Sequence, residues 1–155
     1  MLKIGDKFPA FELVDQAGAI HSLKSLKGTP FVIFCYPKDA TSGCTVEVCE
    51  FRDTKALHKL VKLFGISPDT ENSHKKFADA QELPYPLLSD PEKQLLDPIG
   101  VWGEKSMYGK KYFGVLRTTF FVDSTGKVAH VWEKVKPEGH AAEVLKVVKA
   151  ILIKK

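Results

Sequence analysis

Cysteine is scarce in this chain of 155 residues, which contains three in total. The pattern Cys-x-x-Cys is absent, which argues against general disulfide exchange. The sequence also offers no second close pair of cysteines or histidines that could complete the four ligands of a structural zinc site. We therefore expect neither a metal nor another cofactor.

Long apolar runs and blocks of like charge are missing as well. No apolar run approaches the roughly 18 residues of a membrane span, and the N-terminus has no apolar stretch of signal-peptide type. The net charge is +4, and the lysine pairs Lys110-Lys111 and Lys154-Lys155 lack the interleaved aromatics of a nucleic-acid patch. We expect a cytoplasmic protein without membrane or nucleic-acid partners, in a compartment where structural disulfides are rare.

Apolar runs and turn signals alternate along the chain and predict a mixed α/β protein. Continuous apolar runs predict buried strands, and turn signals at 15–18 and 123–126 predict hairpins. Helix starts and one-sided apolar patterns predict helices. The expected strands are 31–36, 61–67, 117–123 and 127–134, with an extended segment at 83–88. The expected helices are about 41–59, 70–81, 92–100 and 140–153.

The order of these elements constrains the architecture. Early strand–helix–strand units favour parallel pairing, and the late hairpin adds antiparallel strands. We expect a mixed central sheet flanked by helices on both sides, preceded by an N-terminal hairpin. The length fits one domain with a real core, and the chain shows no repeat or linker, so residues 1–155 are expected to form a single domain.

Two of the three cysteines lie close together in the segment 37–49, PKDATSGCTVEVC. They could be a metal clamp, a structural disulfide, two buried small residues, or a reactive thiol with its partner. Cys44 falls in the first turn of the expected helix, where free N–H groups and the helix dipole stabilise a thiolate. Gly43 allows a close approach there, whereas Glu47 and Glu50 oppose the negative charge, so a cation from elsewhere in the chain would help.

Cys49 lies on or next to the inward face of the same helix. Five helical residues separate two Cα atoms by about 8.6 Å, whereas a disulfide requires roughly 4.4–6.8 Å. The two cysteines therefore cannot bond while the helix is intact, and a bond between them would require the N-terminal end of the helix to unwind. Cys35 lies in a predicted buried strand and is interpreted as a core residue.

The segment Pro37-x3-Thr41-x2-Cys44 resembles the active-site signature of the peroxiredoxins, and Cys44-x4-Cys49 resembles their bacterioferritin-comigratory-protein or PrxQ branch. The resemblance extends over nearly the whole chain and implies a thioredoxin-like fold. The other matching stretches are Gly5-Asp6-x2-Pro9-x-Phe11, Phe51-Arg52-Asp53, Gly65-Ile66-Ser67-Pro68-Asp69, His74-Lys75-Lys76-Phe77, Leu87-Leu88-Ser89-Asp90, Gly103-Glu104-Lys105, Arg117-Thr118-Thr119-Phe120 and His140-Ala141-Ala142-Glu143-Val144.

The resemblance implies a role for each residue of the signature. Cys44 would attack the peroxide and become a sulfenic acid, Thr41 would hydrogen-bond the peroxide, and Pro37 would shield the pocket from water. Arg117 would be the cation that stabilises the Cys44 thiolate and the departing oxygen. Cys49 would form an intramolecular disulfide with Cys44, which thioredoxin or a similar dithiol would reduce, in a protein expected to act as a monomer.

Some alternatives stay open at this point. The chain could be a one-cysteine peroxidase in which Cys49 is structural, or a thioredoxin-like binding module without turnover. Ser42 and Cys35 stand where many relatives have a proline and an aromatic residue, and Cys35 adds a remote second disulfide partner. His140 is interpreted as a surface or capping residue without a catalytic role.

Overall fold

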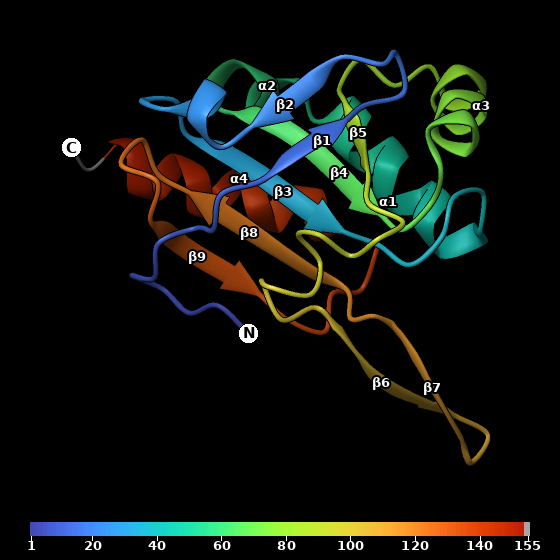
Figure 1. Cartoon of the computed structure of the whole chain (residues 1–155). Coiled ribbons are helices and arrows are strands. Elements are labelled where there is room, and N and C mark those ends of the chain that lie inside the picture. Colours follow the sequence, from blue (N-terminus) through green and yellow to red (C-terminus); the bar gives the residue numbers. More distant parts are fainter. Residues whose placement is uncertain (154–155) are drawn as a thin grey trace.

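The computed structural model describes residues 1–153; Lys154 and Lys155, one of the two lysine pairs noted above, lie outside the described residues. Five strands form the central sheet in the order β5-β4-β3-β8-β9 (Figure 1). Strands β3, β4 and β5 run parallel, and β8 and β9 continue the sheet antiparallel, which confirms the predicted mixed sheet. The strands are β3 (Phe31–Cys35), β4 (Lys62–Ser67), β5 (Leu87–Ser89), β8 (Thr118–Val122) and β9 (Val128–Trp132).

The helices are α1 (Ser42–Asp53), α2 (Lys55–Leu60), α3 (Glu71–Gln81) and α4 (His140–Ile153). The expectation of one helix over 41–59 is wrong, because the helix is interrupted at Thr54, where ψ is 67°. The Thr54 hydroxyl donates to the Glu50 carbonyl at 2.7 Å, a local bond that competes with helix continuation. None of the helices in residues 1–153 combines the length and apolar character needed to cross a bilayer.

The sheet separates two hydrophobic clusters. Alternation along β3 sends Val32 and Phe34 to one cluster and Phe31 and Ile33 to the other. Helices α1, α2, α3 and α4 each contribute buried residues to the cluster around Phe34. The opposite face is covered by the N-terminal segment, the short 3₁₀ helix η1 (Lys24–Leu26) and residues 95–101. The expectation of α-helices on both sides of the sheet is therefore wrong, since all four pack their buried residues on one side.

The expected helix at 92–100 is absent; residues 94–100 form consecutive turns. Lys93 has φ 56°, a left-handed conformation that a regular helix excludes. The Asp90 carboxylate accepts hydrogen bonds from the backbone N–H groups of Gln94, Leu95 and Leu96 at 2.7–2.9 Å. These bonds fix the segment as turns that place its leucines in the core.

The two expected hairpins are confirmed: β1 (Glu12–Val14) pairs with β2 (Ile20–Ser22), and β8 pairs with β9. A third hairpin, of β6 (Trp102–Met107) and β7 (Lys110–Val115), was not predicted and projects from the body (Figure 1). Its strands are largely exposed and lack apolar alternation. Its turn uses Tyr108 and Gly109, both with positive φ, a conformation typical of tight hairpin turns.

Candidate active site

Cys44 lies where the sequence places it, in the first turn of α1. The chain leaves β3 at Cys35, crosses a short loop and enters the helix at Ser42, with Thr41 as the N-cap residue. The Cys44 side chain is fully buried. The Thr41 hydroxyl donates to the Lys38 carbonyl at 3.0 Å and does not cap the helix. Pro37 is half-buried in the same loop.

Arg117 supplies the cation that the sequence argument required. Its Nη2 donates to the Cys44 Sγ at 2.9 Å across 73 positions of sequence. The sheet explains the contact, because Cys35 at the end of β3 pairs with Thr118 at the start of β8. The residues that follow β3 and precede β8 therefore meet at one edge of the sheet. A guanidinium and a helix N-terminus both face the sulfur, and both stabilise negative charge there.

Gly43 leaves the space that the guanidinium occupies. A Cβ at this position would lie 3.1 Å from Arg117 Nη2 and 3.6 Å from Pro137 Cγ. The former distance is tighter than ordinary van der Waals contact, so a side chain here would displace the arginine. The group that comes close to the Gly43 backbone is thus the guanidinium of Arg117.

Glu47 is a site residue that the sequence analysis missed, since its charge was interpreted only as opposing the thiolate. It lies one helical turn after Cys44, and its Oε1 accepts from Arg117 Nη1 at 2.9 Å. Burial raises the pKa of Glu47 to about 7, and the positive charge of Arg117 opposes that rise. Within the described part of the chain, Glu47 Oε2 is buried without a hydrogen-bond partner. Glu47 therefore acts as a partner of Arg117.

Lys105 brings a second positive charge toward the same place from the projecting hairpin. Its ammonium donates to the Val115 carbonyl at 3.0 Å. Burial lowers the pKa of Lys105, the charge of Arg117 lowers it further, and Cys44 opposes the shift. The charges of Arg117 and Cys44 thus act on Lys105, a residue of β6.

The three cysteines are free thiols in different surroundings. Cys49 is half-buried in α1, and its Sγ donates to Gln81 Oε1 at 3.3 Å, at the end of α3. Cys35 is fully buried, as predicted, and burial raises the pKa of its thiol well above the ordinary value. Cys44 and Cys49 share one intact helix, the arrangement in which the helix geometry forbids a bond between them.

His140 departs from the prediction, because it lies inside the protein with 1% of its surface exposed. Its two ring nitrogens contact Thr119 Oγ1 at 2.7 Å and Glu143 Oε1 at 2.9 Å. Burial lowers its pKa. The ring packs edge-on against Phe51 and Trp132, so the surface interpretation is wrong. The helix start was predicted correctly, but of the two partners that satisfy the buried imidazole only Glu143 lies on the same helix, and Thr119 comes from β8.

Comparisons with known proteins identify relatives of the whole chain. A family model described as the AhpC/TSA family matches residues 4–131. The chain is 40% identical over 150 residues to the peroxiredoxin Bcp of Bacillus subtilis, covering 96% of each protein. A solved structure of a PrxQ variant from Xylella fastidiosa superposes with a TM-score of 0.91 at 30% identity, covering 98% of each chain.

A second solved structure comes from the bacterioferritin comigratory protein of Xanthomonas campestris, which was studied for its alkyl peroxide reduction activity. It superposes with a TM-score of 0.86 at 37% identity and covers 91% of each chain. These structures confirm the predicted thioredoxin-like fold with its mixed sheet.

Proposed function

The chain belongs to the AhpC/TSA family and is a peroxiredoxin of the Bcp or PrxQ type, and we propose that Cys44 is the sulfur with which it reduces hydroperoxides. As a member of this family it is a cysteine peroxidase, and its turnover consumes a peroxide and a thiol reductant. The observation that supports the choice of Cys44 is the 2.9 Å contact from Arg117 Nη2 to a buried sulfur at a helix N-terminus.

The proposed first step is nucleophilic attack by the Cys44 thiolate on one peroxide oxygen. An S–O bond forms as the O–O bond breaks, which yields a sulfenic acid and an alkoxide or hydroxide that takes up a proton. Arg117 already faces the sulfur and can stabilise both the thiolate and the departing oxygen. The Thr41 hydroxyl uses its proton on the Lys38 carbonyl, so its oxygen remains able to accept from a bound hydroperoxide. Pro37, half-buried in the same loop, would shield the pocket from water.

The proposed second step is attack by the Cys49 thiol on the sulfenic acid, which forms an intramolecular disulfide and releases water. Two features of the reduced protein must change for this step. The N-terminal part of α1 must unwind, and the contact from Cys49 Sγ to Gln81 Oε1 must break. The half-buried position of Cys49 suits a thiol that becomes accessible when the helix opens.

The remaining parts of the cycle follow from this arrangement. A disulfide that must be reduced in every turnover suits a thioredoxin-like dithiol as reductant and a reducing compartment such as the cytoplasm. Both cysteines belong to one chain, so a monomer suffices for the complete cycle. Hydrogen peroxide and organic hydroperoxides share the O–O bond that is attacked and are the proposed substrates.

A coupled assay with thioredoxin and its reductase tests the proposed function. The wild-type protein should consume hydrogen peroxide, and Cys44→Ser should not. Equal consumption by both proteins would contradict the role of Cys44, and no consumption by either would leave a binding module without turnover. Non-reducing peptide mapping after one equivalent of peroxide tests the second step. A Cys44–Cys49 disulfide is expected, and its absence in an active protein would leave the one-cysteine mechanism with Cys49 as a structural residue.

A further inference from the structure

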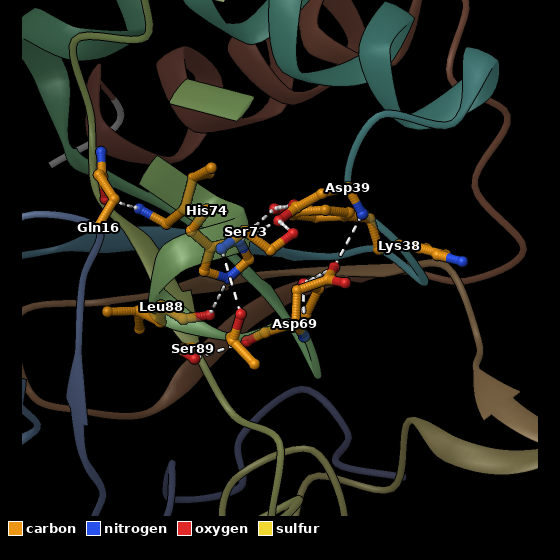
Figure 2. Close-up of polar contacts among 12 residues, drawn as sticks. Gln16, Lys38, Asp39, Asp69, Ser73, His74, Leu88 and Ser89 are labelled. Atoms are coloured by element: carbon orange, nitrogen blue, oxygen red, sulfur yellow. Dashed lines mark hydrogen bonds and ion pairs between the residues drawn. The ribbon is translucent and has the colours of Figure 1, made fainter. Parts of the chain in front are cut away.

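A buried polar cluster joins the loop before α1 to the helix α3, outside the contacts of Cys44. Figure 2 shows Asp39 of the loop facing Ser73 and His74 of α3, with Asp69 beside them. The side chains of His74 and Asp39 are 0% and 4% exposed. Burying two ionisable side chains is costly unless they are paired and hydrogen-bonded, so the contacts of this cluster decide what it does.

The Asp39 carboxylate accepts three hydrogen bonds. Its Oδ1 accepts from the Tyr36 hydroxyl at 2.6 Å, and its Oδ2 accepts from the Ser73 hydroxyl at 2.8 Å and from His74 Nδ1 at 2.7 Å. Its backbone N–H donates to Asp69 Oδ2 at 2.8 Å. Asp39 is therefore tied to the residue that follows β3, to α3 and to the segment before α3 at the same time.

His74 is held from both sides of its ring. Its Nε2 lies 2.9 Å from the Leu88 carbonyl oxygen, which can only accept, so this nitrogen carries a proton. Its Nδ1 lies 2.7 Å from Oδ2 of the Asp39 carboxyl group. The ring therefore bridges the Leu88 carbonyl and the Asp39 carboxyl group, and both ring nitrogens have a partner.

A metal ion is the obvious alternative, because ligand atoms of Asp39, Asp69 and His74 lie within 4.8 Å of one another. The contacts argue against it. Asp39 Oδ2 and Asp69 Oδ2 already take part in two hydrogen bonds each, and both nitrogens of His74 have hydrogen-bond partners. A metal ion would have to displace these bonds. The cluster is complete as a hydrogen-bonded anchor.

The anchor lies in the middle of the loop that carries two residues of the proposed peroxide site. Asp39 is two residues after Pro37 and two residues before Thr41. Its neighbour Ala40 has φ 62°, a backbone conformation that a non-glycine residue keeps only when its surroundings enforce it. The bonds to Asp39 can supply that constraint.

We propose that Asp39 and His74 are a positioning pair for the peroxide-binding loop: they fix Pro37 and Thr41 relative to Cys44 without touching the sulfur. The inference rests on the proposed function of Cys44. It assigns the pair to the alignment of the peroxide, while Arg117 and the start of α1 maintain the thiolate. Loss of the pair should therefore slow attack on peroxide and leave the reactivity of the thiol itself unchanged.

Two rate constants measured on the same protein separate these effects. In a Cys49→Ser background, stopped-flow mixing gives the rate of Cys44 oxidation by hydrogen peroxide, and iodoacetamide gives the rate of Cys44 alkylation. His74→Asn and Asp39→Asn should slow oxidation by about 10–100-fold, the cost of an ångström-scale misplacement. Alkylation, which depends on the thiolate and not on the alignment of a peroxide, should not slow.

The chain offers a matched control in its other close aspartate–histidine contact, between Asp15 Oδ2 and His21 Nε2 at 2.7 Å in the N-terminal hairpin. His21→Asn should change neither rate constant. If His74→Asn slows both the oxidation and the alkylation of Cys44, or slows neither, the positioning role is wrong. Absence of rapid oxidation in the parent protein would instead overturn the proposed function of Cys44.

A milder variant covers the case in which His74→Asn does not fold. Ser73→Ala removes one of the three hydrogen-bond partners of the Asp39 carboxyl group and keeps its contact with His74. It should lower the ratio of the oxidation rate to the alkylation rate by about threefold or more, as expected for one lost hydrogen bond. An unchanged ratio in folded Ser73→Ala protein would overturn the inference.

Discussion

Glu47→Gln should stabilise the reduced protein increasingly as the pH rises. Burial raises the pKa of Glu47 from its ordinary value of 4.5 to about 7, a difference equivalent to about 3 kcal/mol. The folded state therefore binds more protons than the unfolded state between these values, and stability falls as the pH rises through this window. Glutamine has the same shape and stays neutral, so it removes this loss.

Urea unfolding of both proteins at about pH 5 and about pH 8 measures the effect. The stability of Glu47→Gln relative to the wild type should grow by about 2–3 kcal/mol between these conditions. Other groups that titrate in this range cancel in the difference between the two proteins. A difference that does not vary with pH would refute the reasoning, because it would mean that Glu47 ionises as freely when folded as when unfolded.

Two further substitutions test the contacts around the Cys44 sulfur, and a third tests the role of Cys35. Arg117→Ala removes the donor to Cys44 Sγ and should slow peroxide attack about 10²–10³-fold in stopped-flow measurements; a rate near that of the wild type would contradict the assigned role. Gly43→Ala places a Cβ 3.1 Å from Arg117 Nη2 and should slow the same step about tenfold by displacing the guanidinium, so an unaffected rate would count against the need for glycine here. Cys35→Ala should lower the unfolding free energy by about 1 kcal/mol and leave turnover intact, and lost turnover would show that Cys35 takes part in the redox cycle.

Local patterns predicted the position of Cys44 well. The apolar run of β3, the turn residues after it and the helix that follows are all local signals, and together they place Cys44 in the first turn of α1. The contact with Arg117 is different. It depends on the pairing of β3 with β8 across more than 70 residues, and only the resemblance to a family pointed to Arg117.

The features that the sequence did not reveal depend on tertiary packing. Glu47 is an ordinary charged helix residue until α1 packs with that face inward and Arg117, from the segment between β7 and β8, lies against it. His140 becomes a core residue because Thr119 and Glu143 provide partners for both ring nitrogens. The hairpin β6–β7 is exposed on most of its length, so it shows no apolar alternation from which strands could be predicted.

Site-specific trapping of the sulfenic acid tests the central proposal most directly. Reduced Cys49→Ser protein is mixed with one equivalent of hydrogen peroxide in the presence of dimedone, and the peptides are identified by mass spectrometry. We predict a single adduct, on Cys44. An adduct on Cys35 instead, or none while peroxide is consumed, would contradict the account.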